Sequence, residues 1–437
     1  MNRMNVMKTI RLLGALLLVS AAHLAVAGPR IEHWVSPSGA RVYFVENHVL
    51  PMLDVQVAFA AGSSCDPHDK AGLASLTMAL LDMGVDGMDE NRIASRLADL
   101  GALVSGGVDT DRAVVSLRTL SSADKRDAAL DIFRAVLATP KFPSDVFERE
   151  RARTLAALKE ALTRPDTIAS RAFWASMYPD HPYGRYTTPE SIAGIRAEDL
   201  DSFYRGHYGA AGAVVTIIGD LSRSDAEAVA QRLTAGLPSG GGKAPLDAPR
   251  VPQGSEQRLP HPAAQAHILI GMPTLKRGDP DFFALQVGNY TLGGGGFVSR
   301  LMSEVREKRG FAYRVYSYFM PMVQPGPFQI GLQTKKAQAG EALKVTRDVL
   351  SRFLSEGPSD AELSAAKQNL AGSFPLALDS NSKLLDNVSV IGFYGLPLDY
   401  LDIYVANIEK VTAEDVRAAF ARHVKPGMLT TVVVGGE

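Results

Sequence analysis

The sequence contains a single cysteine, Cys65, so no disulfide can form within the chain and packing must hold the fold. Cys65 follows a turn at residues 62–64, and we expect a small buried side chain there rather than a reactive thiol. The 9 histidines include no two that lie three to five residues apart, the spacing that lets two imidazoles on one helix bind the same zinc ion. This absence excludes the helical two-histidine zinc site of a metallohydrolase.

An excess of charge of one sign and long apolar runs are also missing. Basic and acidic residues nearly balance, 46 against 47, so no basic surface indicates a nucleic-acid partner. No stretch reaches ~18 consecutive apolar residues, the length needed to span a bilayer, so we expect no membrane segment. The chain has 437 residues, of which 46% are hydrophobic, and this suits two or three globular domains.

The N-terminus has the three parts of an export signal. Its first residues carry Arg3, Lys8 and Arg11 without an acid, residues 12–19 are apolar, and an Ala-Val-Ala cleavage motif ends at Ala27. The pattern predicts a signal peptide over residues 1–27, cleaved after Ala27. The mature protein is then expected in the periplasm or outside the cell.

Periodic apolar positions predict strands mixed with helices. Polar and apolar residues alternate over residues 54–59, as in a strand with one buried face. The predicted elements are a strand pair at residues 35–45 and 51–59, a strand at 114–120, and helices at 71–83, 90–100, 122–137 and 147–163. Strands in meander order indicate an α+β fold of sandwich type rather than a doubly wound parallel sheet.

A segment rich in glycine and proline divides the chain near its middle. Residues 239–260 show no apolar periodicity, which is typical of a linker. We therefore predict an N-terminal half at residues 28–238 and a C-terminal half at residues 261–437.

Both halves end in the same motif. Residues 192–219 align without a gap on residues 408–435, an offset of 216, and the alignment places His207 on His423. Each segment predicts a helix that starts at Ala-Glu-Asp and leads into a closing strand, so we interpret the pair as an internal repeat. Both histidines fall where a helix ends, where an imidazole can bind free carbonyls, and this favours a structural role over a catalytic one.

An ordered set of short motifs runs through nearly the whole mature chain. It consists of residues 36–42 (SPSGARV), 61–64 (AGSS), 72–74 (GLA), 181–184 (HPYG), 188–192 (TPESI), 203–220, 293–296 (GGGG) and 299–313 (SRLMSEVREKRGFAY). In this order the chain resembles the pitrilysin family, which includes insulin-degrading enzyme and the mitochondrial processing peptidase. The resemblance implies two homologous α/β sandwich halves that form a clam shell in the assembled peptidase.

Active members of that family carry an inverted zinc motif, H-x-x-E-H, directly after Gly-x-Ala. The matching positions here are Ser75, Met78 and Ala79, and the third ligand position, after a Glu-Arg-Glu-Arg run, falls at Ala157. The resemblance thus implies that this chain binds no metal, because the three ligands and the base are replaced together by residues that fit a packed helix. Glu160, one turn away, is interpreted as a solvated helix charge.

The second half keeps two residues that the resemblance makes important. Arg306 lies near the end of a helix that we expect to be capped by Gly310, and Tyr313 begins the strand that follows. Taken alone, they are typical of a solvated charge and a strand aromatic. The resemblance matches them to the arginine and tyrosine that active members bring to the zinc site from the opposite half. Both side chains can donate hydrogen bonds to a peptide carbonyl oxygen that gains charge during hydrolysis.

The glycine run at residues 293–296 lacks the Gly-Lys-Ser/Thr sequence and the preceding strand of a phosphate loop. We therefore expect a flexible or close-packed turn there rather than a nucleotide site.

For the whole chain, the resemblance implies the zinc-free subunit of a periplasmic heterodimeric metallopeptidase. Its partner would be a family member with H-x-x-E-H, which holds the zinc and binds a peptide substrate as an added β-strand. Arg306 and Tyr313 would act in trans, and this chain would need no cofactor of its own. Two alternatives stay open: a peptide-binding or scaffold protein of the same fold without a catalytic role, and a clamshell solute-binding protein, which would have a doubly wound sheet.

Overall fold

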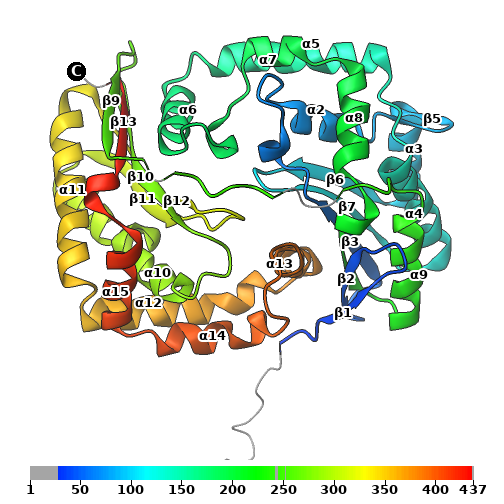
Figure 1. The fold of residues 1–437 in the computed structure, drawn as a ribbon. Coiled ribbons are helices and arrows are strands. Elements are labelled where there is room, and N and C mark those ends of the chain that lie inside the picture. Colours follow the sequence, from blue (N-terminus) through cyan, green and yellow to red (C-terminus); the bar gives the residue numbers. More distant parts are fainter. Residues whose placement is uncertain (1–27, 242–244, 251, 436–437) are drawn as a thin grey trace, which may run out of the picture.

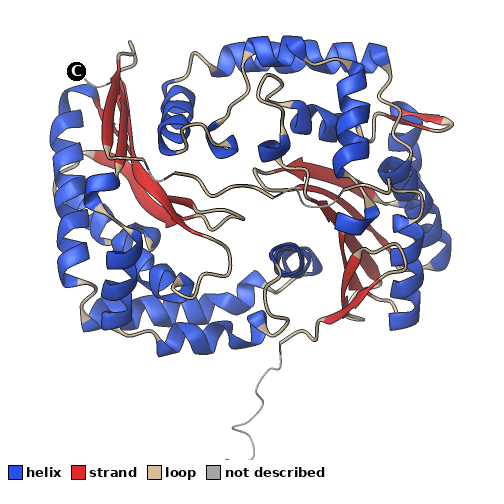
Figure 2. Ribbon diagram, in the orientation of Figure 1, coloured by secondary structure: helices blue, strands red, loops and turns tan. Residues whose placement is uncertain are grey.

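The structure is a computed structural model that describes residues 28–241, 245–250 and 252–435. The predicted signal peptide lies outside these residues. Figures 1 and 2 show two α/β halves that face each other, each with a sheet and a layer of helices on its outer side. Within the described ranges, no helix is long and apolar enough to cross a membrane.

The N-terminal half is built on a mixed sheet with the strand order β1-β2-β8-β3-β7-β6. Its strands are β1 (Glu32–Val35), β2 (Arg41–Glu46), β3 (Met52–Phe59), β6 (Leu103–Val108), β7 (Ala113–Leu120) and β8 (Val214–Gly219). Alternate strand residues such as Val55 and Val57 pack under the outer helices α2 (Leu73–Leu80), α3 (Glu90–Leu100), α4 (Ala123–Ala138), α8 (Ala197–His207) and α9 (Arg223–Thr234). A short hairpin, β4 (Gly84–Val85) and β5 (Met88–Asp89), connects α2 to α3.

The C-terminal half repeats this plan with the strand order β11-β12-β10-β13-β9. Its strands are β9 (Ser255–Leu259), β10 (Gln265–Leu275), β11 (Ala312–Phe319), β12 (Gly326–Lys335) and β13 (Thr430–Val434). The helices are α10 (Phe282–Asn289), α11 (Ala339–Glu356), α12 (Asp360–Ser373), α14 (Tyr400–Lys410) and α15 (Ala413–His423). A second hydrophobic core lies between this sheet and its helices, around Phe328, Phe353 and Phe420.

The two halves are homologous in topology. The order β2-β8-β3-β7-β6 corresponds to β9-β13-β10-β12-β11, and in each sheet the first of these pairs is parallel. The offset of 216 recurs at the helix starts, with α4 and α11 beginning at Ala123 and Ala339, and α8 and α15 at Ala197 and Ala413. In both α8 and α15 the Asp of Ala-Glu-Asp accepts the backbone N–H of the residue before the helix at 2.9 Å. The predicted α+β fold with two homologous halves is confirmed.

Two details of the predicted organisation are wrong. The strands β2 and β3 do not pair with each other, because β8 lies between them and pairs with both. Residues 255–259 of the predicted linker form β9, which pairs with β13 at the edge of the second sheet. The sequence SEQRL of β9 has no apolar alternation because most of this edge strand is exposed to solvent.

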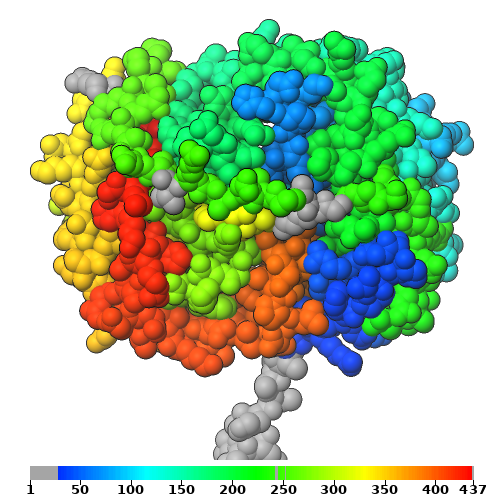
Figure 3. Space-filling view, viewed as in Figure 1, coloured from blue at the N-terminus to red at the C-terminus, as the bar shows by residue number. Residues whose placement is uncertain are grey.

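The halves exchange one helix each across the molecule. α6 (Pro165–Met177) precedes the linker but packs on β10 and β13, whereas α13 (Asn381–Tyr394) packs on β2, β3 and β8. Figure 1 shows both helices between the sheets, and Figure 3 shows the orange C-terminal segment against the blue N-terminal strands. β3 is therefore buried on both faces from Leu53 to Phe59, and the alternation that predicted a solvent face marks a face under α13 instead.

A buried carboxylate joins the two halves. Asp111, in the turn between β6 and β7, is 6% exposed. It accepts hydrogen bonds from the hydroxyl groups of Tyr183 at 2.5 Å and Tyr394 at 3.0 Å. It also accepts the N–H of Val323, in the turn between β11 and β12, at 2.8 Å. Donors from both halves thus stabilise one charge that would be costly to bury alone.

Candidate functional site

The positions of the family's zinc ligands lie on two helices of the N-terminal half. Ser75, Met78 and Ala79 are on α2, and Ala157 is on α5 (Ser144–Ala161). None of these side chains carries an imidazole, thiolate or carboxylate. Ser75, Ala79 and Ala157 are exposed on their helices. Glu160 is exposed as well.

Met78, at the position of the general base, is packed. It is 9% exposed, and a Cβ added at Gly106 of the edge strand β6 would lie 2.6 Å from its sulfur. The methionine therefore fills the space between α2 and β6, and glycine at position 106 leaves room for it. A side chain that could accept a proton from water is replaced here by an apolar contact.

The helix that would carry the zinc motif is nevertheless well anchored. The buried carboxylate of Asp66 accepts the N–H groups of Gly72 and Ala74, each at 2.7 Å, at the start of α2. Burial raises the pKa of this carboxyl group to about 6. The helix at the predicted motif is thus well anchored, although Ser75, Met78 and Ala79 offer no imidazole or carboxylate.

The structure brings Arg306 and Tyr313 together. Arg306 lies in a helical turn, η7 (Met302–Glu307), and the chain then turns at Gly310, whose φ of 63° favours glycine. Tyr313 lies in a bulge of the edge strand β11, where the pairing with β12 shifts. Its ring is 84% exposed, and the ring centroid lies 4.9 Å from the guanidinium carbon of Arg306.

Phe297 completes this group, which we call the Arg306 cluster (Phe297, Arg306 and Tyr313). The Phe297 ring centroid lies 4.7 Å from the guanidinium carbon, so two aromatic rings contact the same cation. Phe297 is 64% exposed. The sequence analysis missed Phe297, although a large aromatic residue directly after the glycine run was a usable signal.

Neighbouring charges leave Arg306 without an ion pair. Glu304 binds Lys308 and Arg309 instead, each at 2.7 Å, and these bonds lower the pKa of Glu304 to about 2. In the described part of the chain, no carboxylate lies within ion-pair distance of Arg306. Its N–H groups can therefore donate to an incoming oxygen.

The glycine run before this cluster is a close-packed turn. A Cβ at Gly293 would lie 2.5 Å from the Ser317 hydroxyl, and one at Gly295 would lie 2.7 Å from the Tyr290 carbonyl oxygen. The run follows α10 rather than a strand, so it lacks the context of a phosphate loop.

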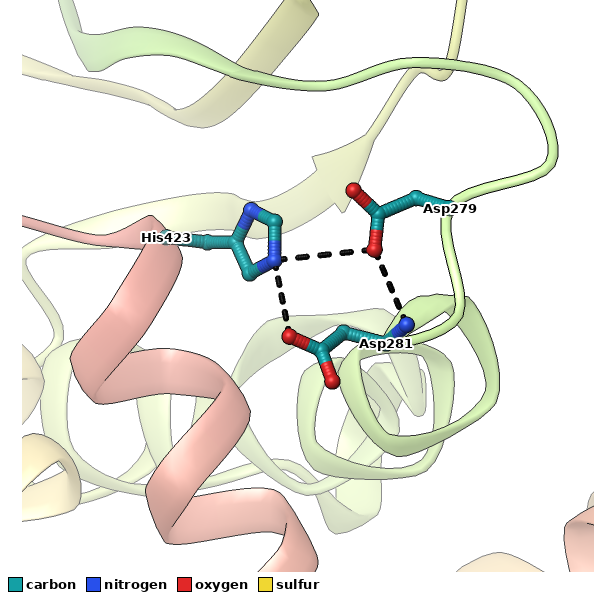
Figure 4. A group of neighbouring side chains, drawn as sticks. All are labelled: Asp279, Asp281 and His423. Atoms are coloured by element: carbon teal, nitrogen blue, oxygen red, sulfur yellow. Dashed lines mark hydrogen bonds and ion pairs between the residues drawn. The ribbon is translucent and has the colours of Figure 1, made fainter.

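The two repeat histidines end their helices but make different contacts. His207 stacks on Phe203 with ring centroids 4.4 Å apart, and burial lowers its pKa. His423 lies 3.0 Å from Asp281 and 3.7 Å from Asp279. Figure 4 shows its imidazole facing both carboxylates. Within the described ranges, these last three residues are the one group close enough to share a metal ion. Arg422 also makes two hydrogen bonds of 2.7 Å to Asp281, so we interpret the group as an ion-pair clamp between α15 and α10.

Cys65 is only partly buried, in contrast to the expectation of a buried side chain. Its Sγ lies 3.4 Å from the carbonyl oxygen of Ala60, and burial raises the pKa of the thiol. The protonated form is favoured, which argues against a reactive thiolate.

Two family models match the chain. The model described as "Insulinase (Peptidase family M16)" matches residues 41–189, and "Peptidase M16 inactive domain" matches residues 194–370. The non-peptidase homolog YmxG of Helicobacter pylori is 26% identical, over 91% of this chain and 92% of its own length. An uncharacterized zinc protease of Streptomyces coelicolor is 30% identical, over 70% of this chain and 68% of its own length.

Solved structures have the same architecture. A peptidase M16 inactive domain from Pseudomonas fluorescens matches with a TM-score of 0.90 at 40% identity, over 93% of this chain and 98% of the other. The periplasmic protease PqqL from Escherichia coli has the same fold with a TM-score of 0.78 at 16% identity, over 94% of this chain and 46% of PqqL. Since both family models match and relatives align over most of its length, the chain belongs to peptidase family M16, the insulinase family.

Proposed function

We propose that this chain is the zinc-free subunit of an exported heterodimeric M16 peptidase. In this assembly the partner carries H-x-x-E-H and zinc, and the Arg306 cluster of this chain reaches the peptide bond that the partner hydrolyses. The names of two relatives, a non-peptidase homolog and an M16 inactive domain, support the absence of catalysis by the chain alone.

The observation that carries the proposal is a difference in side chains between the two halves. The zinc positions hold Ser75, Ala79 and Ala157, while Arg306 and Tyr313 lie 4.9 Å apart on the other half with the guanidinium unpaired. The guanidinium of Arg306, which is partly buried and has no ion pair with a described residue, is restricted by two aromatic rings. Such a restricted donor suits a developing oxyanion, because its orientation is set before the reaction.

Two further observations support the proposed compartment and the proposed partner. The predicted signal peptide and the periplasmic location of PqqL support an exported protein. This chain matches 46% of PqqL, so that protein has room in one chain for a second unit of similar size. A separate partner of similar size would supply the same second unit here.

The test is reconstitution with an H-x-x-E-H family member from the same cell. The two chains should elute as one complex, and cleavage of a quenched peptide should rise with added chain until the subunits are equimolar. The isolated chain should contain far less than one zinc per molecule after dialysis. Stoichiometric zinc in the isolated chain, or a partner that is fully active alone, would contradict the proposal. Complex formation without any gain in turnover would instead favour the scaffold alternative.

A further inference from the structure

The inner face of the second sheet carries a cavity that the proposed function does not use. The cavity has a volume of about 410 Å³ and lies between α6 and the strands β10, β11 and β12. Trp174 of α6 lines it on the helix side, and Tyr316 and Tyr318 of β11 line it on the sheet side. This volume suits a single amino-acid residue of a ligand rather than a large cofactor.

Strand pairing places the residues of the sheet side. Tyr316 and Gly331 are paired neighbours on β11 and β12, and Tyr318 and Gln329 form the next pair on the same face. A Cβ at Gly331 would lie 2.5 Å from the Tyr316 hydroxyl, so glycine there allows the tyrosine ring to lie flat across the sheet.

Helical spacing places the residues of the other side. Asp166, Ser170 and Trp174 are four residues apart in α6, so they share the face that α6 turns toward the cavity. The helix is held over the sheet by Phe173 and Met177, which pack with Val432 and Val434 of β13. The cavity is therefore a fixed feature of the exchanged helix and its sheet.

Polar groups that line this cavity have no protein partner. Gln329 lines the cavity and is 6% exposed, yet nothing in the described part of the chain forms a hydrogen bond with its side-chain amide. The hydroxyl groups of Tyr316 and Tyr318 likewise form no hydrogen bond with a described residue. These groups are therefore available to bind the polar atoms of a ligand that enters the cavity.

The charges of the cavity indicate the sign of that ligand. The guanidinium of Arg314 lies over the Tyr316 ring at 5.0 Å and, among the described residues, has no carboxylate within ion-pair distance. Asp166 also lines the cavity, but its carboxylate and the Arg164 guanidinium 3.9 Å away are both largely exposed, so solvent screens their charges. The imidazole of His267 also lines the cavity, and burial lowers its pKa, which favours the neutral form. One uncompensated positive charge therefore remains, and a carboxylate is its natural partner.

We propose that this cavity binds one carboxylate-bearing residue of a peptide. The carboxylate pairs with Arg314, the aliphatic or aromatic part of the residue lies against Trp174 and Tyr318, and the Gln329 amide bonds the peptide backbone. The carboxylate comes either from a peptide C-terminus or from an Asp or Glu side chain. The site lies entirely within this chain, so it does not depend on pairing with a zinc-bearing subunit.

The experiment is a titration of the isolated full chain, followed by the fluorescence of Trp174. The chain has 2 tryptophans, so Trp34→Phe leaves Trp174 as the single indole. The probes are acetyl-Ala-Ala-Phe with a free carboxylate, the same peptide as its C-terminal amide, and acetyl-Ala-Glu-Phe-amide. The free acid should bind saturably and at least tenfold more tightly than the neutral amide. Binding of the Glu peptide would identify a side-chain carboxylate as a second source. Equal binding of the acid and the neutral amide, or no saturable change with any probe, would overturn the proposal.

Two substitutions locate the site. Arg314→Gln should weaken binding of the free acid about tenfold and leave the neutral amide unaffected, as expected for the loss of one charged hydrogen bond. Arg92→Gln, an exposed arginine of α3, is the matched control and should bind like the parent chain. If Arg314→Gln does not fold, Gln329→Leu provides the second measurement and should weaken both the acid and the amide. Parent-like binding in the folded variants would place the carboxylate elsewhere and reject the assignment.

Discussion

The inner faces of the two sheets occupy equivalent places in the repeat but differ in what covers them. Val114 of β7 pairs with Ala58 of β3, and the equivalent pair in the second sheet is Gln329 of β12 with Gly271 of β10. Val114 and Ala58 pack against α13 in an apolar cluster. Gln329 instead lines a cavity beneath α6. The same topology therefore closes one face with apolar contacts and leaves the other open and polar.

The edge strands show the same difference. Small residues, Ser105 and Gly107, stand on β6 where the equivalent positions of β11 carry Tyr316 and Tyr318. Polar groups also lie under α13, where Arg118 binds Asp54 at 2.7 Å and the Gln56 amide donates to Ser116 at 3.1 Å. Asp54 Oδ2, Gln56 Oε1 and the Thr216 hydroxyl have no partner in the described part of the chain. Strand order and helix placement are thus alike in the two halves, whereas the side chains on their inner faces differ.

The largest effect is expected at the Arg306 cluster of the C-terminal half, which would contact the substrate. In a reconstituted complex, Arg306→Ala and Tyr313→Phe should each lower turnover on the order of a hundredfold, because each removes one donor to the developing oxyanion. The measurement is hydrolysis of a quenched peptide at saturating substrate, with complex formation followed on a sizing column.

The matched control is Arg309→Ala, since Arg309 lies near Arg306 in sequence but is bound to Glu304. It should change turnover less than about twofold, as expected for an exposed ion pair. Parent-like turnover in both Arg306→Ala and Tyr313→Phe would show that the cluster is surface packing, and would favour the scaffold alternative.

The next largest effect is expected from a change at Asp111, the buried carboxylate that joins the two halves. Asp111→Asn keeps the size of the side chain but removes the charge that accepts from Tyr183, Tyr394 and Val323. We expect a loss of about 3 kcal/mol in the free energy of unfolding, because charged hydrogen bonds are lost in a buried site. Urea unfolding measures the loss, with Asp348→Asn as an exposed control. Equal unfolding midpoints would show that Asp111 does not hold the halves together.

The sequence predicted the repeated unit well because its signals are local. The Ala-Glu-Asp starts, the helix-end histidines and the gap-free offset each depend on neighbouring residues, and α8 and α15 begin at the expected positions Ala197 and Ala413. The exchange of α6 and α13 was not predictable in this way. An apolar helix face does not specify which sheet it covers, so β3 was expected to have a solvent face.

The candidate site was predictable in part for a similar reason. The resemblance selected Arg306 and Tyr313, and the structure places them in contact. The resemblance did not select Phe297, although its place directly after the glycine run was a usable signal. It gave no signal for Gln329 and Arg314, whose significance depends on which groups lack a partner. Missing partners are a property of the packed molecule and cannot be counted along a sequence.

The packing of α13 on the sheet of the N-terminal half can be tested by substitutions at two glycines within helices. A Cβ at Gly392 of α13 would lie 2.7 Å from the Tyr43 ring and 2.8 Å from Val214, so Gly392→Ala should cost about 1–3 kcal/mol through overpacking. Gly372 of α12 has no atom within 4 Å of its added Cβ, and Gly372→Ala should stabilise the chain by about 0.5–1 kcal/mol. Thermal melting gives both signs, and a stabilising Gly392→Ala would mean that α13 is loosely packed on the sheet.

The smallest expected effect is a pH dependence at the start of α12, in the C-terminal half. In the first turn of α12, Glu362 accepts two hydrogen bonds of 2.7 Å from Arg300. The counterpart helix α5 has Pro143 as its N-cap, and no side chain caps it. Arg300 and the helix start lower the pKa of Glu362 to about 2, against a reference value of 4.5. A lowered pKa means that the stabilisation is fully present above pH 4.5 and is lost as the pH falls toward 2. Because the pair is partly exposed, the contribution should be about 1 kcal/mol or less.

Glu362→Gln should therefore be less stable than the parent chain at pH 7, and the difference should shrink at pH 3. Urea unfolding of both chains at several pH values measures this difference, and Glu341→Gln, an exposed glutamate of α11, should match the parent chain throughout. A difference that stays constant from pH 7 to pH 3 would show that the charge of Glu362 contributes nothing. In that case apolar packing would hold the start of α12, as Val146 and Phe147 hold the start of α5, and the two halves would be alike at this position.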